Sequence, residues 1–205
     1  MKIAVIAGSQ RAGSNSERAA HLLARRLPEV VAGAEPEVIS LANDRLPFWN
    51  SDFSEPSERF QAAWTPISQT LAAAEAVIAI TPEWAGMASP ALKNLLLMCS
   101  NYEVAHKPGL IVSISTGTGG AYPVAELRMS GTKNNHLCWL PDHLILRQFA
   151  TLAPALEAAW WGGAAAHDVA RRVDYTLTLL AEYAVALGAV RRSGRLDFTA
   201  FPNGL

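Results

Sequence analysis

The sequence predicts an α/β fold in which a parallel sheet lies between two layers of helices. Apolar runs with the length of strands alternate with segments of helical periodicity along the 205 residues. The strongest runs are continuously apolar rather than alternating, which is typical of strands buried on both faces. Half of the residues are hydrophobic and only 17% are charged, so the chain can bury a large core and disorder is excluded as its main state.

Five segments are expected to form the strands of this sheet. Four are strongly apolar, one of these is interrupted by Pro141, and the segment EVISL is weaker. In chain order the five span Ile3–Ala7, Glu37–Leu41, Ala76–Thr81, Leu110–Ser115 and Leu137–Leu146.

Helices are expected between and after the strands. The segment that follows Ser89 begins with a capping serine and a first-turn proline, which is a common helix start. Pro66 lies inside another segment and is the weakest point of the pattern. The expected helices span Ser16–Leu27, Glu58–Ala74, Ser89–Cys99, Gly120–Ser130 and His167–Leu187, with loops at Asn43–Pro56 and Trp160–Gly163. This alternation predicts one doubly wound domain over residues 1–205.

Charge and cysteine content exclude several classes of function. Lys and Arg total 17 against 18 Asp and Glu, so the chain lacks the basic excess of nucleic-acid-binding proteins. Cys99 and Cys138 lie far apart, outside any metal-binding spacing, and are expected as buried thiols in a reducing compartment. The apolar run after Lys2 is too short for a signal peptide or a membrane span. We therefore expect a cytoplasmic protein without membrane or nucleic-acid partners.

The loop after the first strand, GSQRAGSNS, has the chemistry of a phosphate-binding loop. Small residues let backbone amides converge, serine hydroxyls donate, Arg11 supplies a forked cation, and the helix that follows adds its positive end. The alternative is that the serines only cap this helix. The candidate residues are Ser9, Arg11, Ser14, Asn15 and Ser16.

Three motifs, each at the end of a predicted strand, carry a resemblance to a known family. They are GSQRAGS after the first strand, PEWAG followed by SPALKN after the third, and STGTGG followed by ELR after the fourth. The segment LPFWN at Leu46–Asn50 carries a weaker resemblance to the same family. Over residues 1–147 the sequence resembles the NADPH-dependent FMN reductases, a branch of the flavodoxin-like fold.

This resemblance implies a fold, a cofactor and an activity. The fold is a five-stranded parallel sheet of order 2-1-3-4-5, and the cofactor is FMN, reduced by NADPH or NADH. The electrons pass to a small acceptor such as a quinone, an azo compound, a metal oxyanion or free flavin. The alternative is an electron-transfer or redox-sensing flavoprotein without nucleotide turnover. A homodimer or a dimer of dimers is also implied.

The resemblance further implies which residues line the flavin ring, besides the phosphate loop. No catalytic acid or base and no metal ligand is nominated, because hydride transfer needs alignment rather than a protein proton shuttle. Glycines in this set would let backbone approach the ring closely. The ring-lining residues are Pro82, Glu83, Trp84, Ala85, Gly86, Ser115, Thr116, Gly117, Gly119 and Gly120.

A few residues remain open to two interpretations. Ala85 stands where the family pattern has an asparagine, so a side-chain contact is expected to be missing there. Trp84 either stacks on the ring or packs in the core. Trp49, Trp160 and Trp161 are expected in loops, as dimer-interface anchors or as surface lids. Lys93 and Asn94 are expected as polar-face residues of their helix.

Overall fold

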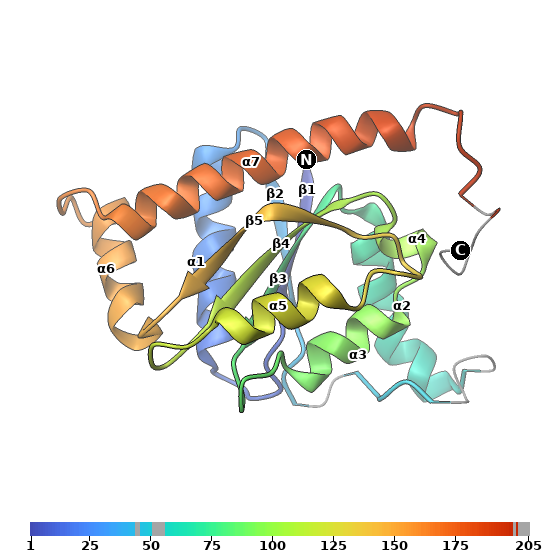
Figure 1. Cartoon of the computed structure of the whole chain (residues 1–205), viewed down its shortest axis with the longest axis horizontal. Coiled ribbons are helices and arrows are strands. Elements are labelled where there is room, and N and C mark those ends of the chain that lie inside the picture. The colour runs from blue at the N-terminus through green and yellow to red at the C-terminus, as the bar shows by residue number, and fades with distance from the viewer. Residues whose placement is uncertain (44–45, 51–55, 199, 201–205) are drawn as a thin grey trace.

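The computed structural model describes residues 1–43, 46–50, 56–198 and 200. Its five strands are parallel and form one sheet in the order β2-β1-β3-β4-β5, which confirms the predicted fold class and strand order (Figure 1). The strands span β1 (Lys2–Ala7), β2 (Glu35–Ser40), β3 (Ala76–Pro82), β4 (Pro108–Ile114) and β5 (Cys138–Leu146). That residues 1–205 make one domain stays a prediction.

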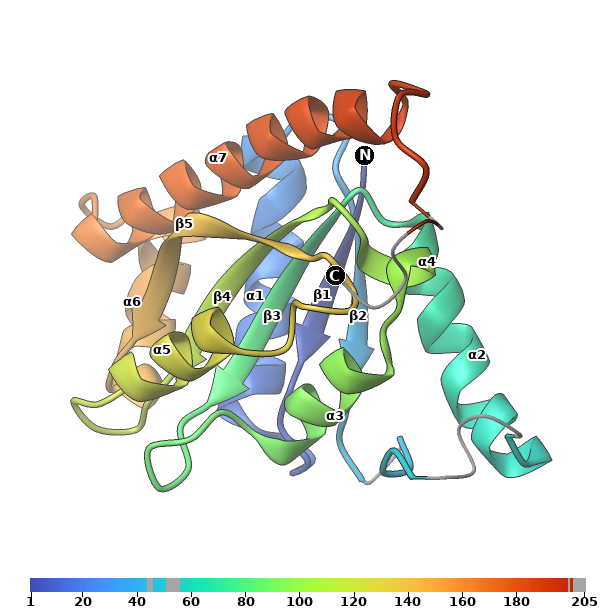
Figure 2. The ribbon, with the colours of Figure 1, turned by 45° about the vertical axis from the view of Figure 1, so that its right-hand side comes forward.

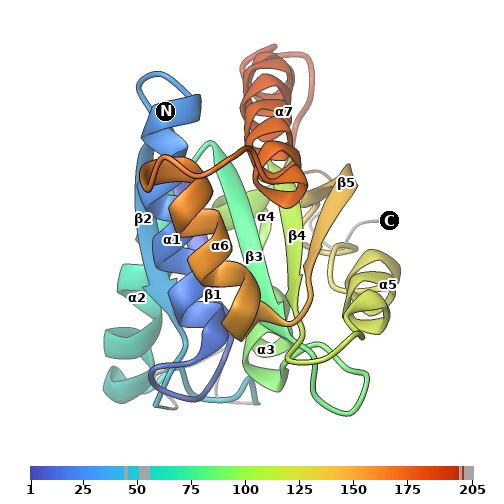
Figure 3. The ribbon, with the colours of Figure 1, turned by 90° about the vertical axis from the view of Figure 1, so that its left-hand side faces the viewer.

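Helices cover both faces of the sheet, as Figures 2 and 3 show. One layer contains α1 (Asn15–Val30), α6 (Phe149–Trp161) and α7 (Asp168–Arg191). The other contains α2 (Glu58–Ala73), α3 (Pro90–Met98), the short α4 (Asn101–Val104) and α5 (Ala121–Met129).

The central strands are apolar throughout because both of their faces are covered. In β1, Ile3 and Val5 pack under the α1 layer, whereas Ala4 and Ile6 pack under the α2 layer. Successive side chains of a strand point to opposite faces, so every position of a strand between two helix layers is buried and favours an apolar residue. This is the physical origin of the continuous runs in the sequence.

Pro141 does not end β5, although it interrupts the apolar run there. Gly109 pairs with Trp139 and Ile111 with His143, so β5 carries two residues more than β4 between these pairs. The strand therefore bulges around Pro141. β5 is an edge strand, where a missing amide proton leaves no neighbouring strand unpaired.

The prediction of a loop at Trp160–Gly163 was wrong for its two tryptophans, which form the end of α6. No helix was expected over Phe149–Trp161, and α4 was not expected either. The Trp161 ring lies 3.7 Å from the Arg25 guanidinium carbon, and its Nε1 donates to Glu29 Oε1 at 2.8 Å. The end of α6 is thus fastened to α1, which lies beside it in Figure 3.

Among the helices that the structure describes, only α7 is long and apolar enough to cross a membrane. Its buried residues Val173, Leu177 and Leu180 pack against the core under the sheet. The apolar stripe of α7 is therefore used inside the fold, as in the core helices of many globular proteins.

Both thiols are free. Cys99 is buried as predicted, and this burial raises the pKa of its thiol well above the ordinary value. Cys138 is only partly buried, which differs from the expectation. Within the described ranges, no three His, Cys, Asp or Glu side chains form a group that could hold a metal ion.

Lys107 is a buried cation at the amino end of β4. It is 6% exposed, and its Nζ donates to the carbonyls of Leu71 and Ala72 at 2.7 and 2.8 Å. Both carbonyls lie near the end of α2 and complement an ammonium group. Burial nevertheless lowers the pKa of Lys107 to about 8.

This pKa predicts how stability depends on pH. Between about pH 8 and pH 10 the unfolded chain holds the Lys107 proton more tightly than the folded chain. The free energy of unfolding should therefore rise with pH in this window, by at most about 1.4 kcal/mol per pH unit from this group. Urea titrations at several pH values should show this slope relative to Lys107→Met. Equal slopes in the two proteins would contradict the prediction.

Candidate functional site

The loops after β1, β3 and β4 surround a cavity at the carboxyl edge of the sheet, which faces the lower edge of Figure 2. Strand order reverses between β1 and β3, and ligands of doubly wound folds bind at this point. The volume of the cavity is about 390 Å³. It is lined by Ser9, Arg11, Ala12, Gly13, Ser14, Asn15, Ser16, Pro82, Glu83, Trp84, Ile114 and Thr116.

The β1–α1 loop presents hydrogen-bond donors to this cavity. Ser14 caps α1, because its Oγ accepts from the Glu17 amide at 3.2 Å, and Ser9 Oγ accepts from the Arg11 amide at 3.2 Å. The capping interpretation of Ser14 is therefore correct, but accepting a bond leaves each hydroxyl proton available to donate.

Ser16 differs from the other serines of the loop. It is 1% exposed, and its Oγ has no hydrogen-bond partner among the described residues. In the described part of the chain the amides of Asn15 and Ser16 also have no acceptor. A buried hydroxyl and two first-turn amides without partners form a donor set that suits an anion with several oxygens, such as a phosphate group.

Arg11 and Trp84 connect two loops across the cavity. The Arg11 guanidinium carbon lies 5.3 Å from the centre of the Trp84 ring, within the range of a cation–π contact. Arg11 comes from the β1–α1 loop and Trp84 from the loop after β3. Together they give the cavity one cationic and one aromatic wall, and Glu83 adds a carboxylate.

Ala85 and Gly86 form the tip of a tight hairpin. The Trp84 amide donates to the Met87 carbonyl at 3.1 Å, and the Met87 amide donates back at 2.9 Å. Both central residues have positive φ, 50° at Ala85 and 75° at Gly86. This is the pattern of a type I′ turn, for which Asn-Gly is preferred. The conformation gives a backbone reason for an asparagine at position 85, and neither tip residue lines the cavity.

Ala85→Asn should therefore stabilise the protein. Alanine is strained in the left-handed region, where asparagine is tolerated, so a gain of up to about 1 kcal/mol is expected. For a chain of this size that gain raises Tm by about 2–4 °C. Scanning calorimetry of the apoprotein should show the shift, and Ala165→Asn serves as a control at an exposed loop alanine without positive φ. A Tm equal to that of this control would contradict the prediction.

In the loop after β4, Gly119 and Gly120 exclude a side chain for different reasons. Gly120 has φ +107°, and an added Cβ would lie 2.4 Å from Ile145 Cγ2. At Gly119, φ is outside the left-handed region, and an added Cβ would lie 2.0 Å from Glu83 Oε2. A side chain is thus disfavoured by the backbone conformation at Gly120, and by the Glu83 carboxylate at Gly119.

The structure brings nine of the fifteen predicted site residues into the lining of one cavity. The other six are not part of its lining: Ala85, Gly86, Ser115, Gly117, Gly119 and Gly120. Sequence reasoning did not nominate the lining residues Ala12, Gly13 and Ile114. The first two stand inside the phosphate-loop segment, so their position in the chain was a usable signal.

Lys93 and Asn94 were both expected on a polar helix face; Lys93 is exposed as expected, whereas Asn94 is buried. Asn94 is 7% exposed; its Nδ2 donates to the Pro47 carbonyl at 2.9 Å, and its Oδ1 accepts from the Trp49 amide at 2.8 Å. Lys93 Nζ donates to Glu126 Oε1 at 2.7 Å, which joins α3 to α5. The hydrophobic environment opposes ionisation of Glu126, but this bond and one from the Ala88 amide hold its pKa below the ordinary value.

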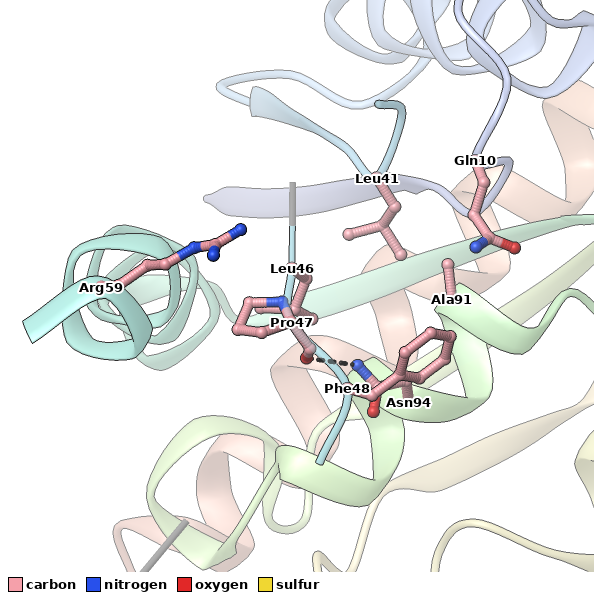
Figure 4. A pocket seen from close by; sticks show the side chains of 8 residues that line it. All are labelled: Gln10, Leu41, Leu46, Pro47, Phe48, Arg59, Ala91 and Asn94. Atoms are coloured by element: carbon pink, nitrogen blue, oxygen red, sulfur yellow. Dashed lines mark hydrogen bonds between the residues drawn. The ribbon is translucent and has the colours of Figure 1, made fainter. Parts of the chain in front are cut away.

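A second, smaller cavity lies beside the β2–α2 loop (Figure 4). Its volume is about 160 Å³, and the Asn94–Pro47 hydrogen bond crosses one side of it. Arg59 reaches toward it from α2, while Leu41, Leu46, Pro47, Phe48 and Ala91 make most of its wall. Its described lining contains no serine and no glycine, unlike that of the larger cavity, which remains the better candidate for the functional site.

Comparisons with known proteins agree with this geometry. An NADPH azoreductase from Bacillus sp. (strain OY1-2) is 32% identical over 120 residues, which cover 58% of this chain and 62% of the azoreductase. The flavoenzyme NAD(P)H:(acceptor) oxidoreductase FerB from Paracoccus denitrificans has the same fold, with a TM-score of 0.66, 21% identity and coverage of 90% of this chain and 97% of FerB. An NADH:FMN oxidoreductase, EmoB, in its apo form matches with a TM-score of 0.65, 13% identity and coverage of 90% and 89%.

The match to a family settles the classification. The profile described as NADPH-dependent FMN reductase matches residues 1–151, about three quarters of the 205 residues. These residues include all three loops around the cavity. The resemblance seen in the sequence is therefore confirmed, and with it the expectation of FMN as cofactor and NAD(P)H as electron donor. This chain belongs to the NADPH-dependent FMN reductase family of oxidoreductases.

Proposed function

We propose that the 390 Å³ cavity holds FMN and that the protein is an NAD(P)H oxidoreductase which passes electrons to a small acceptor. The observation that carries the cofactor assignment is the buried Ser16 hydroxyl, which has no partner among the described residues and stands beside two first-turn amides in the same condition. Arg11 supplies the positive charge that a phosphate requires.

The residues of the cavity would divide the binding of FMN between them. Ser9, Arg11, Ser14 and Ser16, with the Asn15 amide, would hold the phosphate. Pro82–Trp84 and Thr116 would line the isoalloxazine ring, which supplies the hydride chemistry when FMN is bound. The protein's own part is to bind, to orient and to exclude water. None of these residues is assigned a proton transfer.

The acceptor is proposed to be a small oxidised molecule such as a quinone, an azo compound, a metal oxyanion or free flavin. The Bacillus relative is an NADPH azoreductase, which supports azo compounds as the first class to test. The lining residues Arg11, Ala12 and Gly13 are exposed, so the cavity is open to solvent and an acceptor can reach it without a domain movement. A cytoplasmic location is proposed with this function.

Anaerobic mixing of the FMN-loaded protein with NADPH or NADH tests the activity. Rapid loss of the oxidised-flavin absorbance, followed by its return on addition of an azo compound or a quinone, supports the proposal. Reduction that remains slow at saturating concentrations of both nucleotides would instead indicate an electron carrier or a redox sensor. Failure to retain FMN would overturn the cofactor site itself.

We also propose that two copies of the chain associate through the α3–α5 side. Leu97 on α3 is 57% exposed and Met129 on α5 is 85% exposed, and a groove of about 230 Å³ lies between the two helices. Exposed apolar side chains around a groove are typical of an interface. Trp49 is held to α3 by Asn94, but Trp160 and Trp161 lie in the opposite layer and are not part of this interface.

Light scattering at micromolar concentration should give the mass of a dimer or of a dimer of dimers. Leu97→Asp should lower this mass to that of one chain, whereas Val185→Asp, at an exposed position of α7, should not. A monomeric wild-type protein would overturn the proposed assembly without affecting the cofactor assignment.

A further inference from the structure

Arg147 follows β5 and reaches back to the glycine-rich loop after β4. Its Nε donates to the Thr118 carbonyl at 2.7 Å and to the Gly119 carbonyl at 2.9 Å. These residues precede it by 29 and 28 positions in the chain. The guanidinium group is exposed and has no carboxylate partner in the described part of the chain.

The two residues after Arg147 hold the same loop. The Gln148 amide donates to the Gly117 carbonyl at 3.0 Å, and the Phe149 amide donates to the Ser115 carbonyl at 3.2 Å. Four of the carbonyls between positions 115 and 119 are therefore bound by the junction between β5 and α6. The loop is supported from one side, along its carbonyl oxygens.

This support leaves the amide protons of the loop available. In a trans peptide group the C=O and N–H bonds point in opposite directions. The carbonyls of Thr118 and Gly119 face Arg147, so the N–H groups of Gly119 and Gly120 face away from it. Within the described residues neither N–H group has an acceptor. Gly119 borders Glu83, which lines the cavity.

We propose that Arg147 is a positioning residue that presents the N–H groups of Gly119 and Gly120 as donors to the flavin ring. The proposal rests on the proposed cofactor site. Binding of both carbonyls fixes the orientation of the two peptide groups, and the positive charge polarises them, so their N–H groups become stronger donors. Reduced FMN carries more negative charge on its ring than oxidised FMN, and it gains more from such donors.

Arg147→Ala tests this role, with Arg128→Ala as a matched control. Arg128 is also exposed, and it donates to two consecutive carbonyls, those of Pro141 and Asp142 at 2.8 and 3.3 Å, on β5. FMN is titrated into each apoprotein by fluorescence quenching, and the midpoint potential of the bound flavin is measured. We expect Arg147→Ala to weaken binding of reduced FMN about tenfold more than that of oxidised FMN, which lowers the two-electron midpoint potential by about 30 mV.

Hydrogen exchange on the apoprotein gives a readout that does not depend on the cofactor. The amides of Gln148 and Phe149 are bonded to the loop carbonyls of Gly117 and Ser115, so they should exchange faster in Arg147→Ala than in the wild type and in Arg128→Ala if Arg147 holds the loop in place. Arg147→Lys keeps the charge but loses the planar fork, so an intermediate potential is expected.

The outcomes separate this inference from the cofactor site. A potential and an exchange rate unchanged in Arg147→Ala, with FMN still bound, would overturn the positioning role alone. Failure of the wild-type protein to bind FMN would overturn the cofactor site, and the positioning role with it. Equal shifts in Arg147→Ala and Arg128→Ala would show a general effect of surface charge and would also overturn the positioning role.

Discussion

Replacing Arg11 with alanine is expected to weaken FMN binding by more than about tenfold, because a charge-assisted bond to a phosphate contributes about 1.5–3 kcal/mol. Arg11 is the cationic side chain among the described lining residues, and its guanidinium group contacts Trp84 on the opposite wall. The side chain is exposed, so its loss should leave the fold intact. Equilibrium titration of the apoprotein with FMN measures the change.

Two variants show whether charge or geometry is responsible. Arg11→Lys should recover part of the affinity, since it keeps the charge without the two-pronged geometry. Arg18→Ala removes the same charge from α1 outside the cavity lining, where Arg18 pairs with Glu157, and should have little effect. Wild-type affinity in Arg11→Ala would show that the phosphate lies elsewhere.

Gly119→Val is expected to reduce FMN binding by more than about tenfold, or 1.4 kcal/mol, while the protein still folds. A Cβ at this position would lie 2.0 Å from Glu83 Oε2, so the carboxylate has to move, and Glu83 lines the cavity. The backbone at Gly119 is not in the left-handed region, so valine adds no strain of that kind. FMN fluorescence on the folded fraction, beside a thermal melt, separates binding from stability.

The neighbouring glycine provides the contrast. Gly120→Val places a branched side chain at φ +107° and 2.4 Å from Ile145 Cγ2, so we expect it to lower stability itself by about 2–3 kcal/mol. If displacement of Glu83 causes the loss in Gly119→Val, then Glu83→Ala combined with Gly119→Val should regain affinity. A lower Tm with unchanged FMN affinity in Gly119→Val would show that this loop supports the fold and does not contribute to FMN binding.

Most of the fold could be predicted because its elements are specified locally. β1, β3 and β4 are buried on both faces, and their continuous apolar runs mark them directly. α6 was not predicted because it contains Pro154 and several alanines, which obscure its apolar periodicity. Its buried residues are Phe149, Ala153 and Leu156. Trp160 and Trp161 were predicted as loop residues because the sequence does not show what covers them. Trp161 contacts Arg25 and Glu29 of α1, which are distant in sequence.

The candidate site, too, could be predicted only in part. Its loops were predictable, since the strand ends and small residues that form them are contiguous in the chain. The roles of Asn94 and Arg147 were not, because each side chain binds backbone 28 or more positions away. The polar character of each residue does not show whether its side chain bonds to distant backbone or only to water.

The sequence by itself therefore determined the five strands, the helices α1, α2, α3, α5 and α7, the family and the three loops that meet at the carboxyl edge of the sheet. Short-range periodicity, caps and glycines specify these features. Only the tertiary structure decided that Ser16 is buried without a described partner, that Glu83 restricts Gly119, and that Arg147 holds the loop after β4. These are contacts between distant segments, and they exist only once the sheet has brought its strand ends together.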